Sequence, residues 1–298
     1  MSPARMCSSE RDSPCEEGVP VKFGFIVPNA SAEQVLELAE EIEANGWDGF
    51  FYWDGIGGGS GDMNVFDPWA ILAAAAVRTE RITLGAMIFP LSRRRPWVVA
   101  RQALTVDHLS NGRLVIPVGL GAVDDGGFSK VHPEVTDRKQ RAALLDETLD
   151  ILDLAWKGES FSFAGAHYQL DDIRFVPKPI QQPRIPIWVV GSWPRPKSMA
   201  RAARWDGIVP SISTDPFRQP SPPEIEAIGG WLREHRTSDG PYDIVLEGVS
   251  PGADAEWVAN TLQSLADAGA TWWIESRWEA PNDYDVLLKR IRQGPPRP

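Results

Sequence analysis

Few side chains in this sequence are placed to do chemistry, and the most suggestive is Asp54, which follows the aromatic run Trp47–Trp53 (WDGFFYW). A carboxylate in that place can act as an acid or base, or it can cap a helix. The acidic pair Asp124–Asp125 and His132 are further candidates for contact with a substrate. The two cysteines and four histidines are dispersed, so they do not form the cluster of ligands that a metal ion needs.

Positive charge is the second chemical feature. Arg93, Arg94 and Arg95 form the strongest local basic patch in a chain whose formal net charge is -11. Arginines can hold an anionic substrate or a cofactor tail, or they can pair with nearby carboxylates. We take Arg95 as the candidate for substrate contact. Asp107 and Arg113 (DHLSNGR) are expected to pair with each other across a turn.

The elements that must position these side chains alternate regularly. Short apolar runs are followed by amphipathic runs, as where a helix opens at Ser31, with Gln34 completing a capping box, and stops at Gly46. Strict alternation implies a parallel sheet, and eight units predict an α/β protein with a closed (β/α)8 TIM barrel. A doubly wound open sheet is the alternative, ranked lower because no GxGxxG follows the first strand. The expected strands are 21–27, 47–53, 82–88, 114–120, 187–190, 207–212, 242–249 and 271–275.

Composition limits the setting of this barrel. Residues 1–20 are polar and aperiodic, which predicts a disordered tail before a single domain at 21–298. Residues 158–183 lack helical period and are expected to form an excursion. The acidic balance argues against nucleic acid and membranes as partners, and no apolar stretch reaches the ~20 residues that span a bilayer. With both cysteines in the tail, we expect a cytoplasmic protein.

The order of several motifs resembles one known family. Active sites of β/α barrels lie at the C-terminal ends of the strands. Here the succession ITLGAMI (82–88), SRRRP (92–96), LVIPVGLG (114–121) and PIWVVGSW (186–193) is similar to the bacterial luciferase-like monooxygenases. The resemblance extends over about residues 21–212. It implies a barrel whose mouth binds a reduced flavin or a deazaflavin.

The resemblance also implies cofactor contacts near the strand ends. Glycines 119 and 121 would let a flat ring approach the backbone. Relatives often have a non-prolyl cis peptide at the end of the third strand, here between Met87 and Ile88. They grip the cofactor phosphate at a helix N-terminus after the fifth strand, where Ser192 lies, and with a helix-borne arginine, here Arg141. The expected cofactor-binding residues are Trp53, Ala86, Met87, Ile88, Gly119, Leu120, Gly121, Arg141, Gly191, Ser192 and Trp193.

One departure from the family pattern bears on mechanism. Many relatives read Trp-Asp-His where this chain reads Trp53–Asp54–Gly55. The missing histidine puts a simple histidine proton relay in doubt. The glycine-rich stretch that follows, residues 56–64, suggests a mobile lid that excludes water, or else a loop that is simply disordered. Candidate catalytic and substrate or lid residues are therefore Asp54, Arg95, Asp124, Asp125 and His132.

The implied function is that of a flavin-dependent monooxygenase. It would use reduced FMN, supplied by a separate flavin reductase, and oxygen to oxygenate a small organic substrate. The alternative is hydride transfer with the deazaflavin coenzyme F420, which we rank second. A non-catalytic flavin-binding barrel and an unrelated hydrolase using Asp54 and Glu275 are further alternatives. Relatives of this family are often homodimers.

Overall fold

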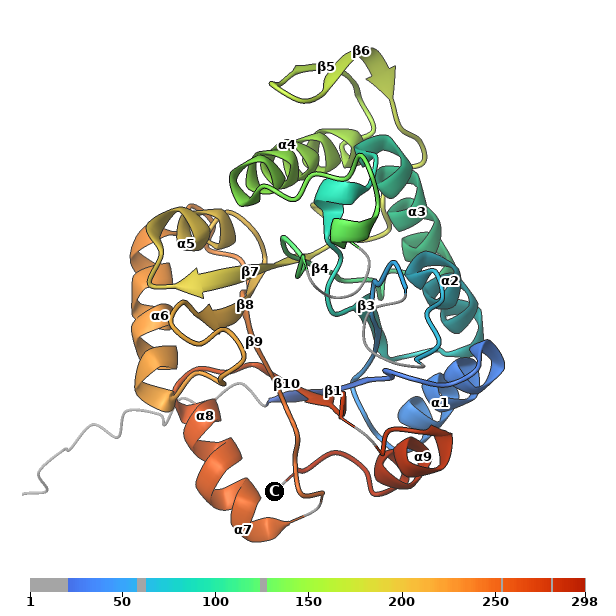
Figure 1. Cartoon of the computed structure of the whole chain (residues 1–298), viewed down its shortest axis with the longest axis vertical. Coiled ribbons are helices and arrows are strands. Elements are labelled where there is room, and N and C mark those ends of the chain that lie inside the picture. The colour runs from blue at the N-terminus through green and yellow to red at the C-terminus, as the bar shows by residue number, and fades with distance from the viewer. Residues whose placement is uncertain (1–20, 58–62, 124–127, 253, 280, 298) are drawn as a thin grey trace, which may run out of the picture.

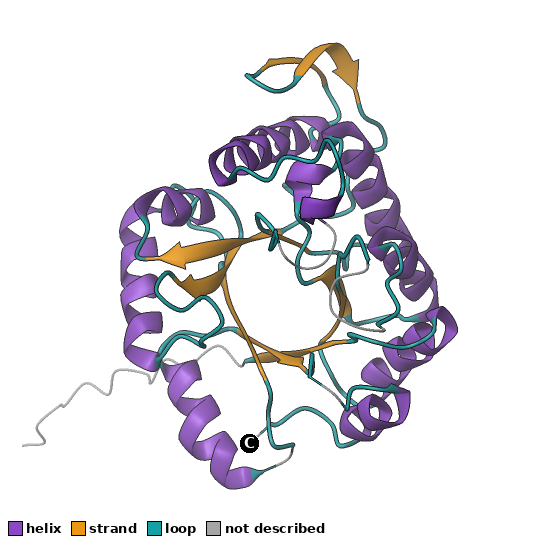
Figure 2. Cartoon of the chain, viewed as in Figure 1, coloured by secondary structure: helices purple, strands orange, loops and turns teal. Residues whose placement is uncertain are grey.

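Eight parallel strands close almost completely into a ring, which Figure 2 shows nearly end-on. The computed structural model describes residues 21–57, 63–123, 128–252, 254–279 and 281–297, so the expected disordered tail lies outside them. The strands pair in the order β3, β2, β1, β10, β9, β8, β7, β4, and isolated bridges near β3 and β4 complete the ring. The predicted TIM barrel is confirmed. Its strands are β1 Lys22–Ile26, β2 Gly49–Tyr52, β3 Thr83–Ala86, β4 Ile116–Val118, β7 Ile187–Trp193, β8 Gly207–Ile212, β9 Asp243–Gly248 and β10 Trp272–Ser276.

Helices cover the outside of the ring (Figure 1). The predicted capping box at the first of them is confirmed, because Ser31 and Gln34 exchange hydrogen bonds, and Gly46 follows the helix with a φ of 81°. Within the described residues, no helix combines the length and apolar character needed to cross a bilayer. The α-helices are α1 Ala32–Ala44, α2 Pro68–Arg78, α3 Pro96–Leu109, α4 Arg138–Trp156, α5 Pro196–Ala202, α6 Pro222–His235, α7 Ala255–Trp257, α8 Gln263–Asp267 and α9 Tyr284–Arg292.

The fifth strand of the barrel is longer than predicted. β7 was expected to end at Val190, but it pairs with β8 through Trp193 and Ile212. The following helix therefore begins at Pro196 rather than at Pro194, with Arg195 as its N-cap residue, and ends at Ala202. Backbone pairing with β8 thus holds Ser192 inside the strand.

Side chains alternate between the barrel lumen and the layer under the helices. On β9, Val245 packs in the lumen with residues such as Phe51 and Trp272, whereas Ile244 and Leu246 pack in the outer core. Glu247 continues the same alternation. Its carboxyl group therefore faces the lumen near the C-terminal end of the strand, where the mouth opens.

A two-stranded antiparallel hairpin stands beside α4. It consists of β5 Ser160–Ala164 and β6 Gln169–Arg174, within the region 158–183. The Glu147 carboxylate on α4 accepts hydrogen bonds from the backbone N–H groups of Ala166, His167 and Tyr168. One carboxylate thus fastens the turn of the hairpin to the barrel.

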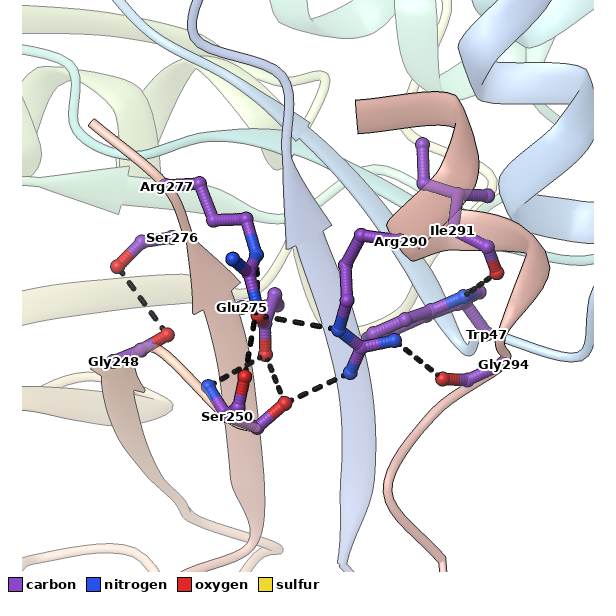
Figure 3. Close-up of polar contacts among 9 residues, drawn as sticks. All are labelled: Trp47, Gly248, Ser250, Glu275, Ser276, Arg277, Arg290, Ile291 and Gly294. Atoms are coloured by element: carbon purple, nitrogen blue, oxygen red, sulfur yellow. Dashed lines mark hydrogen bonds and ion pairs between the residues drawn. The ribbon is translucent and has the colours of Figure 1, made fainter. Parts of the chain in front are cut away.

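A buried charge network fixes the C-terminal helix to the last strand (Figure 3). Glu275 on β10 is fully buried, and its carboxylate accepts from Arg277 Nε at 2.9 Å and from Ser250 Oγ at 2.6 Å. Arg290 on α9 lies 3.4 Å from the same carboxylate and donates to Ser250 Oγ at 2.8 Å and to the Gly294 carbonyl at 2.7 Å. Its guanidinium also lies 5.0 Å from the Trp47 ring centroid. The network joins β10, the loop after β9 and α9.

Candidate active site

A cavity of about 850 Å³ opens at the mouth of the barrel. Its lining residues come from the ends of β7 and β8, from the loops after β2, β3, β4, β8 and β10, and from α4 and the α5 region. The volume lies within the range of about 300–1,000 Å³ that is typical of small-molecule and cofactor sites. The mouth therefore has room for a cofactor together with a small substrate.

One wall of this cavity is basic. It carries Arg138 and Arg141 from α4 with Arg195 and Arg201 from the α5 region. Arg201 is paired with Asp146 at 2.8 Å, whereas the guanidinium groups of Arg138 and Arg195 make no hydrogen bond or ion pair with any described residue. Two exposed guanidinium groups at one wall of a cavity suit a phosphate group.

The structure changes the expected role of Ser192. It lines the cavity but does not cap a helix, because it belongs to β7 and its backbone N–H donates to Ser198 Oγ at 2.9 Å. Helix α5 has only seven residues. The charged groups at this wall are the arginine side chains.

Arg141 supports the loop after β4. The buried guanidinium donates from Nη1 to the carbonyls of Leu120 at 2.7 Å and Gly121 at 2.9 Å, and it lies 5.2 Å from the Phe128 ring centroid. Sequence reasoning assigned Arg141 to the cofactor phosphate, which stays a prediction. Its contacts show that it also fixes the backbone of the predicted glycine-containing loop.

Gly119 and Gly121 line the cavity, and each leaves room for a neighbouring side chain. A Cβ at Gly119 would collide with the Ile88 side chain, and Gly121 has a φ of 72° with Pro90 Cβ 2.8 Å from where its own Cβ would lie. The Met87–Ile88 peptide bond is cis, as the resemblance implied. Met87, Ile88 and Leu120 also line the cavity.

Three predicted cofactor contacts do not line the cavity. Ala86 is buried in β3, and Trp193 packs partly against the outer core. Gly191 faces Ile208 and Met199, so it allows β7 to pack closely against α5. The alternation of side chains explains this, because only every second residue of a strand faces the lumen.

Asp54 is held by two arginine side chains. It lines the cavity, but its side chain is only 1% exposed, and Arg93 Nη2 donates to it at 2.9 Å. Arg94 donates to it from both Nε at 2.8 Å and Nη2 at 2.7 Å. The basic patch read from the sequence therefore neutralises this carboxylate, and Asp54 acts as a structural anchor for the loop after β3.

The remaining substrate candidates lie away from the cavity or outside the described residues. Arg95 is exposed and lies 5.9 Å from the Trp97 ring centroid, and His132 is exposed in the loop after β4. Neither lines the cavity. Asp124 and Asp125 are outside the described residues, as are residues 58–62 of the predicted lid.

An aromatic wall faces the basic one across the mouth. Trp53 follows β2 and Trp278 follows β10, the two strands that flank β1. On the other side of the ring, α4 follows β4 and α5 follows β7, and these two strands are neighbours (Figure 1). The two indoles meet edge to face, with centroids 5.7 Å apart and an interplanar angle of 87°. Sequence reasoning identified Trp53 but missed Trp278, which lies in a loop.

Glu247 stands behind this wall and was also missed. Its Oε1 accepts from Trp278 Nε1 at 2.8 Å. The residue as a whole is only partly buried, but its carboxyl group is deeply enclosed in the lumen. Burial raises the pKa of Glu247 above its ordinary value of 4.5, while hydrogen bonds from Trp278 and Ser276 act in the opposite direction. The alternation around Val245 is the sequence signal that could have identified it.

The raised pKa makes stability depend on pH. The folded protein binds more protons at Glu247 than the unfolded chain does, so the free energy of unfolding falls as pH rises above the unfolded value of about 4.3. Glu247→Gln can still accept from Trp278 but does not ionise. In this variant we expect the free energy of unfolding to fall less as pH rises. The difference from wild type should be about 1.4 kcal/mol for each pH unit between the pKa of Glu247 in the folded protein and its pKa in the unfolded chain.

Urea unfolding between pH 4 and pH 8 measures this difference. Glu226→Gln, which changes an exposed glutamate on α6, is the matched control and should follow the wild-type curve. Parallel curves for Glu247→Gln and wild type would contradict the expectation.

This chain is similar to known proteins over most of its length. A model of the luciferase-like monooxygenase family matches residues 17–223. The chain is 28% identical to the F420-dependent glucose-6-phosphate dehydrogenase of Nakamurella multipartita, over 92% of this chain and 87% of that protein. It is 27% identical to the FMNH(2)-dependent dimethylsulfone monooxygenase of Pseudomonas putida, over 93% and 85%.

Solved structures show the same fold. An F420-dependent secondary alcohol dehydrogenase, solved with an F420-acetone adduct, superposes with a TM-score of 0.74 at 15% identity, covering 93% of this chain and 98% of that one. The family inferred from the order of motifs is confirmed. The chain therefore belongs to the luciferase-like monooxygenase family and is a luciferase-like oxidoreductase.

Proposed function

We propose that the protein is a monooxygenase that uses reduced FMN and oxygen to oxygenate a small organic substrate. The observation that carries the proposal is the mouth cavity, with exposed arginines at one wall and an uncharged aromatic pair at the other. FMN has a phosphate at one end and a flat ring system at the other. The group therefore matches the polarity of the cavity.

The lining residues suit FMN. Arg138 and Arg195 would hold its phosphate, and the hydrocarbon side chains of Met87, Ile88 and Leu120 would contact its ring. The cofactor would supply the redox chemistry, and a separate reductase would provide the cofactor in its reduced form. The chain's own residues bind it, orient it and enclose the site.

Hydride transfer with F420 is the second candidate, because the Nakamurella multipartita relative is named as F420-dependent. Oxidation of a substrate alcohol needs a base that accepts the hydroxyl proton. Among the described residues that line the cavity there is no histidine, and the single carboxylate, Asp54, is held by two arginines. This lack of a free base supports FMN and oxygen over an F420-dependent alcohol dehydrogenase.

Anaerobic titration of the apoprotein with reduced FMN, oxidised FMN and F420 tests the proposal. We expect reduced FMN to bind most tightly and the loaded protein to consume oxygen faster when substrate is present. Selective binding of F420 would make the protein a hydride-transfer enzyme. Binding of flavin without any oxygen or substrate consumption would indicate a binding protein.

A phosphate-specific variant sharpens this test. Arg195→Gln removes an exposed guanidinium that has no partner among the described residues, so the fold should persist. We expect about tenfold weaker FMN binding, about 1.4 kcal/mol, and unchanged binding of riboflavin, which lacks the phosphate. Equal losses for FMN and riboflavin would place the phosphate elsewhere.

A further inference from the structure

The aromatic wall offers a ligand almost no polar contact. Trp53 Nε1 donates to the Pro28 carbonyl at 2.9 Å, and Trp278 Nε1 donates to Glu247 Oε1 at 2.8 Å. Both indole N–H groups are therefore already bonded to the protein. What Trp53 and Trp278 present to the cavity is hydrocarbon surface and ring edges.

Gly55 makes this arrangement possible. A Cβ at position 55 would lie 2.5 Å from Cζ3 of Trp53 and 3.1 Å from Cε3, much closer than side-chain atoms approach in proteins. Any larger residue would therefore displace the indole. Gly55 thus allows the Trp53 ring to lie against Trp278.

Of the two carboxyl groups next to the pair, Asp54 is paired with arginines and Glu247 is enclosed behind Trp278. The Asp54 carboxylate, beside Trp53 in the sequence, accepts three hydrogen bonds from the Arg93 and Arg94 side chains. Glu247 is enclosed behind Trp278 and bonded to it. The guanidinium groups of the cavity lie across the mouth, on the α4 and α5 side.

From these contacts we infer that Gly55, Trp53 and Trp278 form a subsite for an uncharged, apolar ring of the substrate, and that this subsite rejects sugar phosphates. The inference rests on the proposed function, because the aromatic wall faces the substrate only if the cofactor binds at the basic wall. A sugar phosphate here would leave its hydroxyls and its charge without partners, which is unfavourable. An apolar ring would instead bury its surface against the two indoles.

Calorimetric binding of two probes tests the subsite. We would titrate 1-naphthol and glucose 6-phosphate into the apoprotein and into the protein loaded with oxidised FMN. We expect 1-naphthol to bind the loaded protein at least tenfold more tightly than glucose 6-phosphate. Equal or tighter binding of glucose 6-phosphate would overturn the inference.

Variants test whether 1-naphthol binds at the aromatic wall. Trp278→Leu is expected to weaken 1-naphthol at least tenfold, whereas Trp278→Phe, which keeps an apolar ring but loses the N–H, should stay within about threefold. Trp97→Leu removes a tryptophan on α3 that does not line the cavity and should have no effect. Gly55→His should repeat the loss by displacing Trp53. Equal 1-naphthol affinity in wild type, Trp278→Leu and Gly55→His would overturn the subsite.

The two proposals can fail separately. If FMN does not bind, the proposed function fails, yet the apoprotein titrations still show whether the indole pair holds 1-naphthol. If FMN binds and drives oxygen consumption while Trp278→Leu binds 1-naphthol as wild type does, only the subsite is wrong.

Discussion

Replacing Glu275 by glutamine is expected to lower the free energy of unfolding by about 3–5 kcal/mol, the usual cost of removing one partner from a buried ion pair. Glu275 is fully buried and faces both Arg277 and Arg290, and the side chain of Arg290 is only 5% exposed (Figure 3). Glutamine has nearly the same shape but no charge, so both guanidinium groups would lose their counter-ion. Urea unfolding at neutral pH measures the loss.

Arg277→Gln is the matched control for this prediction. Its side chain is 25% exposed, so solvent can compensate part of the change, and we expect a smaller loss of about 1 kcal/mol. The double variant should lose less than the sum of the two single losses, because the two residues interact directly. A Glu275→Gln variant as stable as wild type would show that the network contributes nothing to stability.

The second large effect is expected at Arg141. Arg141→Met removes the donor to the Leu120 and Gly121 carbonyls and the cation over Phe128, so the loop after β4 should lose its fixed position. We expect FMN affinity to fall by about 30-fold, which is about 2 kcal/mol. Fluorescence titration of the apoprotein measures it.

Riboflavin distinguishes the two possible roles of Arg141. If the guanidinium acts through the loop, Arg141→Met weakens riboflavin and FMN alike, and this is the result that we expect. A loss confined to FMN would mean that Arg141 contacts the phosphate directly. Arg141→Lys, which retains a cation but has no guanidinium fork, should recover part of the affinity.

The barrel could be predicted from the sequence because each strand and helix is marked by neighbouring residues, and the same pattern repeats along the chain. Capping residues such as Ser31 and Asp67, together with apolar runs, mark nearly every boundary to within two residues. The predicted end of β7 was wrong because pairing with β8 extends the strand through Trp193. This pairing joins residues that are distant in the sequence, so the propensities of neighbouring residues do not predict it.

The partners of charged side chains were the hardest feature to predict, because the long arginine side chain can contact residues that are distant in the sequence. Asp107 and Arg113 were expected to pair, but Asp107 accepts from the Ile180 N–H and the Gln181 amide, while Arg113 donates to carbonyls of Ala76, Thr79 and Ile82. In the same way, Arg93 and Arg94 of the arginine patch pair with Asp54, whereas Arg95 is exposed. A sequence shows which charges exist, but the fold decides which of them meet.

The pairing of β1 with β10 has a consequence for biosynthesis. Lys22 lies beside Trp272 and Ile26 beside Ser276, so the first strand stays without one neighbour until residues 272–276 have left the ribosome. An unpaired strand edge can associate with other chains, and such distant contacts form slowly. Trp53 and Trp278 likewise meet only when this seam closes. We therefore expect nascent chains stalled before β10 to depend on chaperones.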